Sequence, residues 1–249
     1  SLFVQNNDTN ILIDAGVSCK KIIEALASIN ISINDIDAIL ITHEHTDHIK
    51  SLDALSSKYS IPVYANEKTW KAMEKQITRI GEENRNTFDV SKKFSIKDIE
   101  ILPFSIPHDA ADPCGFNIFG SNQKISIATD IGHIDSNIFK KLENSSFVLL
   151  ESNYDPEILK CCSYPYRLKQ RILGPNGHLP NNEAGITISK LIDTGLKQVM
   201  LGHLSKENNF PELAQKTVLE ELSLRNYTEN SVVLSVASRF EPSKLIDIA

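Results

Sequence analysis

The sequence is poor in cysteine and has no long apolar run. Its four cysteines among 249 residues show neither the density of a disulfide scaffold nor C-x-x-C spacing. We therefore expect reduced thiols and a cytoplasmic protein. No apolar run approaches the ~18 residues that a membrane-spanning helix requires. We accordingly expect no membrane partner.

Positive charge, repeats and linkers are also scarce. The net charge is −6, so no basic groove for nucleic acid is visible as an overall charge excess, although bound metal cations would add positive charge locally. The sequence has no internal repeat, no low-complexity tract and no Pro/Gly/Ser-rich linker, which favours one domain over residues 1–249. The chain opens on Ser1 in an apolar stretch without an initiator methionine, so we expect that an N-terminal segment is missing.

Short apolar strands alternate with amphipathic helices along the chain. This mixture is typical of an α/β sandwich. Residues 81–95 are polar, and we expect a loop there. The expected strands are 1–5, 10–16, 37–42, 61–65, 99–108, 124–130, 147–153, 198–203 and 231–237, and the main expected helices are 134–143, 183–193 and 211–224.

Five polar side chains share one position relative to these strands. His43, His108, Asp130, Asn153 and His203 lie at or just beyond the C-terminal ends of apolar strands. Such positions are where α/β proteins place their binding and catalytic sites. Histidines scattered over a surface would not be expected to share this placement.

The stretch "THEHTDHI" (42–49) places three histidines and an aspartate close together. A helix N-cap needs one oxygen, so capping does not explain three imidazoles and a carboxylate. These groups are ordinary ligands of divalent cations. After a strand, His43 and His45 can turn to one side of the chain, while Asp47 and His48 can face a second ion. We therefore interpret the stretch as a metal site.

The motif His43-x-His45-x-Asp47-His48 resembles the signature of the metallo-β-lactamase superfamily. Asp14, His108, Asp130 ("ATD") and His203 ("LGHLS") follow the superfamily's order. The stretches "PHDAADPCGF", "LLESNYD", "YPYRLKQRI" and "GHLPNNEAG" resemble the bacterial YycJ/WalJ (VicX) subfamily. This resemblance covers essentially the whole chain, and it implies a four-layer αββα sandwich with the site along one edge.

The resemblance also implies a ligand set for two divalent ions. His43, His45 and His108 would hold the first ion, Asp47, His48 and His203 the second, and Asp130 would bridge them. Asp14 would orient the histidine loop as a hydrogen-bond acceptor, although a turn aspartate before Gly16 is an alternative. The mixed nitrogen and oxygen ligands suit zinc, manganese or iron.

An aspartate at the bridging position argues against antibiotic hydrolysis. In the superfamily, true β-lactamases place Cys or Ser there, whereas Asp130 resembles members that hydrolyse phosphodiesters, thioesters or lactones. A hydroxide shared by the two ions would attack. Asp47 and His178 are the catalytic candidates, and His178 would protonate the leaving oxygen. A plain surface-loop histidine is the alternative for His178.

Substrate contacts are less well defined by the sequence. Asn153 is a candidate for contact with the substrate or a metal ligand. The run that contains Arg167, Lys169 and Arg171 could meet phosphates, although charged runs usually face solvent. His133 is expected to be an ordinary residue in a first helical turn, and Cys114 a small buried one.

Three functions compete. The leading hypothesis, which rests on the resemblance and on Asp130, is a dinuclear metal-dependent phosphodiesterase that acts on nucleic acid as an exonuclease. The second is a hydrolase of a small cyclic phosphodiester, lactone or thioester, which the acidic net charge favours. The third is a metal-holding regulatory protein without turnover, suggested by the family's association with a cell-wall two-component system. The sequence predicts no oligomeric state.

Overall fold

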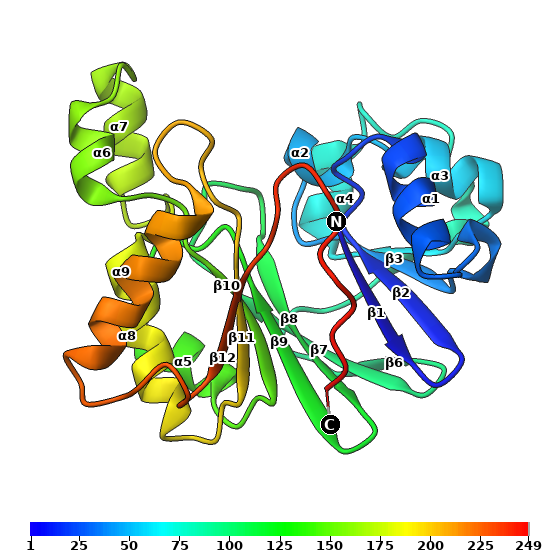
Figure 1. The fold of residues 1–249 in the computed structure, drawn as a ribbon. Coiled ribbons are helices and arrows are strands. Elements are labelled where there is room, and N and C mark those ends of the chain that lie inside the picture. Colours follow the sequence, from blue (N-terminus) through cyan, green and yellow to red (C-terminus); the bar gives the residue numbers. More distant parts are fainter. Residues whose placement is uncertain (249) are drawn as a thin grey trace. The chain divides into compact units, whose positions relative to one another are not determined.

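The computed structural model describes residues 1–248, which cluster into two compact units (Figure 1). The first unit comprises Ser1–Ser105, Ala110–Cys114 and Ile118–Ser121. The second comprises Ile106–Asp109, Gly115–Asn117 and the chain from Asn122 onward. The expectation of a single domain stays a prediction.

The first unit is built on a five-stranded sheet in the order β1-β2-β3-β4-β5. Strands β1 and β2 are antiparallel around a turn in which Asn7 has a φ of 47°, and β3 to β5 then add in parallel. The hairpin β6–β7 also belongs to this unit. The strands are β1 (Leu2–Asn6), β2 (Thr9–Ile13), β3 (Ala38–Leu40), β4 (Val63–Ala65), β5 (Arg85–Thr87), β6 (Phe94–Ile96) and β7 (Ile99–Ser105).

The helices of the first unit follow from local sequence signals. The Ser18 side chain accepts a hydrogen bond from the backbone of Lys21 and caps α1, whose Ile22 and Leu26 are buried one turn apart. These side chains join the apolar core of the unit together with Ile39. The helices are α1 (Cys19–Ser28), η1 (Ile33–Asp35), α2 (Thr46–Ile49), α3 (Leu52–Tyr59), α4 (Glu67–Met73) and η2 (Glu82–Asn84).

The second unit contains four neighbouring parallel strands in the order β12-β11-β10-β9. Strands β9 and β10 end in buried residues, as expected for parallel strands that helices cover. These strands are β9 (Gln123–Ala128), β10 (Phe147–Glu151), β11 (Gln198–Gly202) and β12 (Val233–Val236). Strand β8 (Cys114–Gly120) contributes residues to both units.

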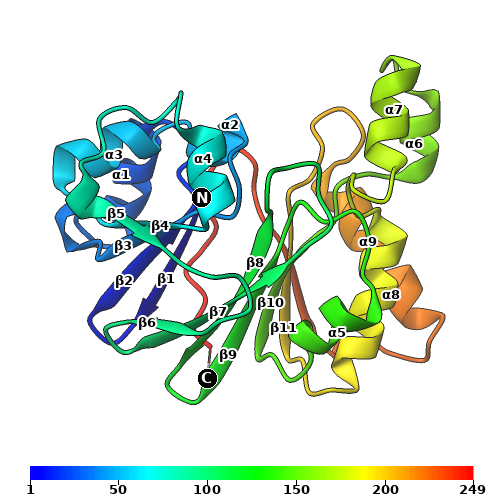
Figure 2. The ribbon, with the colours of Figure 1, turned by 180° about the vertical axis from the view of Figure 1, so that it is seen from behind.

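Helices α5, α8 and α9 lie on one side of these four strands (Figures 1 and 2). Helices α8 and α9 approach closely at Gly185, where a Cβ atom would lie 2.6 Å from Cβ of Glu221. The helices of this unit are α5 (Ser136–Leu142), α6 (Pro156–Cys161), α7 (Tyr166–Leu173), α8 (Asn181–Ile192) and α9 (Pro211–Ser223).

Most expected elements are present, and the α/β class is confirmed. The prediction of a loop over 81–95 is wrong, because the short strands β5 and most of β6 lie there. β5 has the sequence Arg-Asn-Thr and no buried residue, so no apolar pattern marks it. Strand β8 and helices α6 and α7 were not predicted either.

Two expectations drawn from the composition concern the state of the cysteines and the length of the apolar helices. The four cysteines are free, as expected. Among the described residues, no helix combines the length and the apolar character needed to cross a membrane.

Candidate metal centre

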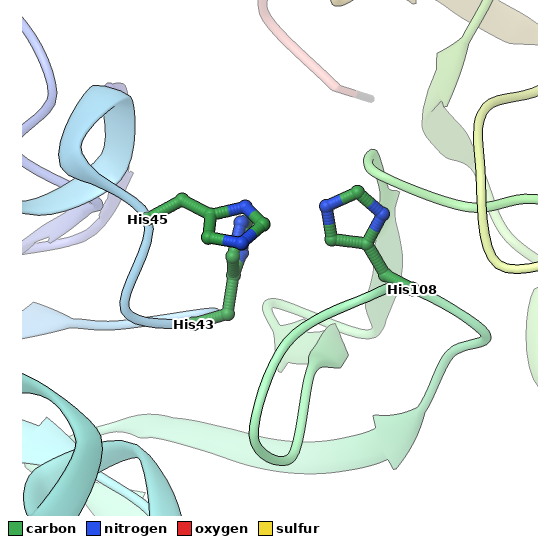
Figure 3. Close-up of side chains that lie close together, drawn as sticks. All are labelled: His43, His45 and His108. Atoms are coloured by element: carbon green, nitrogen blue, oxygen red, sulfur yellow. The ribbon is translucent and has the colours of Figure 1, made fainter. Parts of the chain in front are cut away.

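Three imidazoles gather on the loop that leaves β3 in the first unit. His43 and His45 precede α2, and Asp47 and His48 lie within its single turn. The ring of His43 lies edge-on to that of His45, with centroids 4.6 Å apart, and 4.1 Å from the ring centroid of His48. Figure 3 shows His43 and His45 on this loop, and it also labels His108, which belongs to the second unit.

Asp14 stabilises the histidine loop by hydrogen bonds to Thr42 and His48, which lie at its two ends. Its Oδ2 atom accepts hydrogen bonds from Nδ1 of His48 at 2.8 Å and from the hydroxyl of Thr42 at 2.9 Å, while Oδ1 accepts from the Thr42 backbone N–H. Burial by itself would raise the pKa of the Asp14 carboxyl, but the charge and hydrogen bond of His48 and the Thr42 N–H hold that pKa below its usual value. Asp14 is thus an ionised acceptor that fixes the ring of His48.

Thr42 extends this contact to His43, and sequence reasoning missed its role. The Thr42 hydroxyl donates to Asp14 and lies 3.0 Å from Nδ1 of His43. Because its single hydrogen is given to Asp14, the oxygen accepts from His43, which places the His43 proton on Nδ1. Nε2 of His43 is then the nitrogen that carries a lone pair for a ligand.

The backbone around this loop is tight. A Cβ atom on Gly16 would lie 1.5 Å from the carbonyl oxygen of Asp47, so no other residue fits without a shift. The backbone N–H of Ala15 donates to the carbonyl of His48 at 2.7 Å. Asp14 itself has a φ of 59°, a left-handed conformation that non-glycine residues seldom adopt. The side chain of Asp47 is 70% exposed.

In the second unit, three acidic or imidazole side chains mark the C-terminal ends of neighbouring parallel strands. Glu151 ends β10, His203 follows β11 directly, and Asp130 lies just beyond β9. Because parallel strands end at the same sheet edge, their side chains meet there. Nε2 of His203 lies 3.4 Å from Oδ1 of Asp130, and Nε2 of His108 lies 3.7 Å from the same oxygen.

Two of these residues have strained backbones. Asp130 has a φ of 57° and His203 a φ of 56°, both in the left-handed region. Such conformations in non-glycine residues cost roughly 1–3 kcal/mol each and cluster at functional sites. Asp14 is thus the strained site residue of the first unit, and Asp130 and His203 are those of the second.

Glu151 is the residue that sequence reasoning missed in this unit. It is fully buried, and its Oε1 atom accepts from Nδ1 of His178 at 2.8 Å and from Nδ1 of His203 at 2.7 Å. Its Oε2 atom accepts from the backbone N–H groups of Ile131 and Leu179. Burial alone would raise the pKa of this carboxyl, but the hydrogen bonds and charges of the two histidines lower it.

His178 lies on a compact loop beside His108. The backbone N–H of His178 donates to the carbonyl of Ile172 at 3.1 Å, and a Cβ atom on Gly177 would lie 2.1 Å from that same oxygen. Its ring centroid is 5.2 Å from that of His108 and 5.3 Å from that of His203. His178 therefore lies with the other imidazoles, its side chain 19% exposed.

His108 is suited to act as a neutral ligand. Burial lowers the pKa of its imidazole below the usual value, although the carboxylates of Asp130 and Asp109 act in the opposite direction. Nδ1 of His108 lies 3.3 Å from the carbonyl of Gly177. A proton on Nδ1 would leave Nε2, the atom nearest Asp130, as the ligand atom.

The predicted substrate contacts make protein contacts in this structure. The amide of Asn153 donates to the carbonyl of His203 at 2.7 Å, so it fixes the strained residue. Arg171 forms a two-point ion pair with Asp109, in which NH2 donates to Oδ1 at 3.1 Å and Nε to Oδ2. Oδ1 of Asp109 in turn lies 3.5 Å from Nε2 of His108.

Of two residues outside the ligand set, Cys114 is buried as expected, whereas His133 does not lie in a first helical turn, because α5 begins only at Ser136. Cys114 is buried, and this burial, with the Asp14 and Asp112 carboxylates, raises the pKa of its thiol well above the usual value, so the thiol is protonated. His133 is exposed, and its Nδ1 lies 2.9 Å from the carbonyl of Pro175.

The donor chemistry of each unit fits a divalent cation. In the second unit, Asp130, Glu151, His178 and His203 each offer one ligand atom, and these atoms lie within 4.8 Å of one another. In the first unit, hydrogen bonds at Nδ1 of His43 and His48 direct the Nε2 atoms outward. Imidazole nitrogen and carboxylate oxygen together are the ligands of zinc, manganese and iron sites.

Comparison with known sequences agrees with this chemistry. Residues 9–204 match the family described as the β-lactamase superfamily domain. The chain is 40% identical over 225 residues to exodeoxyribonuclease WalJ of Streptococcus pneumoniae serotype 2, covering 90% of this chain and 84% of that protein. It is 37% identical over 226 residues to exodeoxyribonuclease YycJ of Bacillus anthracis, covering 91% and 86%.

Comparison with solved structures shows the same fold. Zinc-bound PqqB from Methylobacterium extorquens matches with a TM-score of 0.73 and 15% identity, covering 98% of this chain and 86% of that one. The metallo-β-lactamase fold protein YhfI from Bacillus subtilis matches with a TM-score of 0.69 and 16% identity, covering 95% and 88%. The expected fold class is confirmed, and this fold with these donors implies divalent metal ions.

Proposed function

Since the chain belongs to the metallo-β-lactamase superfamily, we propose that it is a dinuclear metal-dependent phosphodiesterase that shortens nucleic acid as an exonuclease. The observation that carries the proposal is Asp130 at the sheet edge, with His203 and His108 both directed at its Oδ1 atom. A carboxylate can be shared between two cations, which a neutral imidazole cannot readily do. The alignment of nine-tenths of the chain with two exodeoxyribonucleases supports nucleic acid as the substrate.

The proposed ligands are the seven residues of the superfamily motif. We assign His43, His45 and His108 to one ion, Asp47, His48 and His203 to the other, and Asp130 to both. Support comes from the Nδ1 contacts, because hydrogen bonds at Nδ1 of His43, His48 and His203 leave Nε2 as the ligand atom. Zinc, manganese and iron all suit this set.

Two divalent ions would supply a water of lowered pKa and positive charge for the phosphate oxygens. The protein then has to orient the substrate and to protonate the leaving oxygen. His178 is suited to the second task as an imidazolium: Glu151 accepts its Nδ1–H, which directs Nε2 outward, and the second proton, carried on Nε2, would pass to the leaving oxygen. The side-chain amide of Asn153 donates to the carbonyl oxygen of His203 and so stabilises the backbone conformation of His203. We therefore regard Asn153 as a positioning residue.

The test is a panel of substrates with purified protein of defined metal content. It compares DNA and RNA labelled at either end, single- and double-stranded, with bis-p-nitrophenyl phosphate and a lactone. Processive shortening from one end that is lost in Asp130→Ala and kept in Asp8→Ala supports the nuclease; Asp8 is an exposed turn aspartate. Turnover of the small compounds alone favours the hydrolase of small esters. No turnover with any metal favours the regulatory protein.

The four free thiols support a cytoplasmic location, which we also propose. The association with a cell-wall two-component system stays a prediction.

A further inference from the structure

Helices α6 and α7 form a hairpin that projects beyond α8 and α9 in the second unit (Figures 1 and 2). The hairpin has a small apolar core of its own, made by Tyr154, Leu159 and Ile172. Pro156 begins α6, and Asp155 caps it through two backbone N–H groups. The hairpin is therefore an ordered part of the unit. Its exposed side chains are not explained by packing and are candidates for binding a ligand.

The hairpin is basic in an acidic protein. Residues 156–173 contain the four cations Lys160, Arg167, Lys169 and Arg171 and one anion, Glu157, whereas the whole chain has a net charge of −6. Arg167 is exposed; the side chains of Lys160 and Arg171 are 61% and 56% exposed and pair with Glu157 and Asp109, which leaves Arg167 as the main cation of the surface. A local positive surface on an acidic chain attracts a polyanion to one place.

The same surface carries an exposed aromatic ring. Tyr166 is 75% exposed at the start of α7, and Leu173 is 45% exposed at its end. Tyr166, Gln170 and Leu173 are spaced i, i+4 and i+7, so they share one face of the helix, with Arg167 and Arg171 beside it. An exposed ring between cations is the arrangement that binds single-stranded nucleic acid, because bases stack on the ring while phosphates meet the cations.

Helix α7 leads directly into the loop of His178. The carbonyl of Ile172 accepts the backbone N–H of His178, and the Arg171–Asp109 pair joins the helix to the residue after His108. Tyr166 lies six residues before Ile172, or about 9 Å along the helix axis. A strand whose end is cleaved near His178 would thus reach Tyr166 within a few nucleotides.

We propose that the exposed face of α7 binds the unpaired end of a nucleic-acid strand, with Tyr166 stacked on a base and Arg167 in contact with a phosphate. This inference rests on the proposed nuclease function and adds a requirement for unpaired nucleotides. Bases inside a duplex are already stacked on each other and do not offer a face to Tyr166.

Binding by the metal-loaded protein of a fluorescent phosphorothioate oligothymidylate, which resists cleavage, tests the proposal. We expect Tyr166→Ala to weaken binding about tenfold, as typical for loss of one base–aromatic stack. Arg167→Ala should reduce the slope of log affinity against log salt by about 0.7, the value for one lost phosphate contact with a single strand. Neither change should alter turnover of bis-p-nitrophenyl phosphate, which is too small to reach α7.

Matched controls are available in the same unit. Leu224→Ala removes an apolar side chain that is 77% exposed, and Lys216→Ala removes a cation whose side chain is 74% exposed; neither should weaken binding. Equal binding by wild type, Tyr166→Ala and Arg167→Ala would overturn the inference, as would an equal effect of Tyr166→Ala on a blunt duplex. If wild type cleaves only small esters, the proposed function itself fails, which is a separate result.

Discussion

Oε1 of Glu151 lies 2.7 Å from Nδ1 of His203. The same oxygen accepts from His178, so one buried carboxylate fixes two imidazoles and turns the Nε2 atom of each away from it. Nε2 of His203 accordingly lies near Asp130. Because Glu151 reaches both rings through protons on Nδ1, it determines which nitrogen of each ring is available for a metal ion or a substrate.

Replacement of Glu151 by glutamine should impair both activity and stability. The amide oxygen can still accept from the two histidines, but the amide nitrogen would then face the N–H donors of Ile131 and Leu179. Two buried N–H groups would lose their acceptor, which costs about 1–3 kcal/mol of unfolding free energy for each such group. We expect activity or metal affinity to fall about 10–100-fold.

Urea unfolding, metal analysis and the rate with bis-p-nitrophenyl phosphate check this expectation. Glu229→Gln makes the same chemical change at an exposed position and should leave all three unchanged. Full activity of Glu151→Gln would show that the orientation of the two rings does not depend on this carboxylate.

His178→Ala should affect substrates according to their leaving groups. A nucleoside alkoxide needs a proton to leave, so we expect hydrolysis of an oligonucleotide to slow about 10²–10⁴-fold. p-Nitrophenolate leaves without a proton, so bis-p-nitrophenyl phosphate should be turned over nearly as fast as by wild type. His133→Ala, which removes an exposed histidine, is the control. An equal loss on both substrates would contradict the role of His178 as an acid.

The sequence predicted those parts of the site that local spacing determines. The cluster of His43, His45 and His48 follows from the strand–loop–helix order of a short stretch. The positions of Asp130 and His203 at strand ends follow from the apolar runs before them. In each case the side chain and the element that places it are neighbours in sequence.

Glu151 and Thr42 could not be predicted in this way, because contacts distant in sequence define their roles. Glu151 closes an apolar strand and meets His203 only because β10 and β11 are parallel neighbours. Thr42 gains its role from Asp14, which is brought to it by the pairing of β2 with β3. Helix α7 was missed because it is short and buries only Ile172, and it is stabilised by a small separate core.

Asp14→Asn tests the acceptor role of Asp14 without a change in backbone preference. Asparagine tolerates the left-handed conformation at this position, where φ is 59°. Its amide nitrogen cannot accept a hydrogen bond, so either His48 or Thr42 loses its partner. We expect metal affinity to fall about 10–100-fold, as measured by competition with a chelator.

An Asn→Asp substitution at another residue with left-handed backbone conformation is the control for Asp14→Asn. Asn144 has a φ of 57° and is exposed, and Asn144→Asp should leave metal affinity unaltered. If Asp14→Asn lowered stability but bound metal as tightly as wild type, Asp14 would have a purely structural role.

The ion pair between Asp53 and Arg79 should make stability depend on pH. Burial alone would raise the pKa of Asp53, but hydrogen bonds from the side chain and backbone of Arg79 lower it below the usual value. A lowered folded-state pKa stabilises the protein above the unfolded-state value, and this stabilisation is lost as pH falls through the folded-state pKa. The difference in unfolding free energy between wild type and Asp53→Asn should therefore narrow below about pH 4. Urea unfolding at several pH values measures it, and a constant difference would contradict the pair.

Gly16→Ala should disrupt the histidine loop from the backbone side. A Cβ atom at this position would lie 1.5 Å from the carbonyl oxygen of Asp47, and a rigid backbone atom cannot yield as a flexible side chain can. Forcing an extra methyl group into a packed site costs about 1–3 kcal/mol, occasionally more. The shift would also move His48, whose carbonyl is held by Ala15. We therefore expect loss of stability in urea together with weakened metal binding. At Gly174 the nearest atom to an added Cβ is the carbonyl oxygen of Gln170 at 3.2 Å, so a shift of a few tenths of an ångström suffices and Gly174→Ala should cost much less stability than Gly16→Ala. Equal behaviour of the two variants would show that the close approach of Gly16 to Asp47 does not constrain the loop.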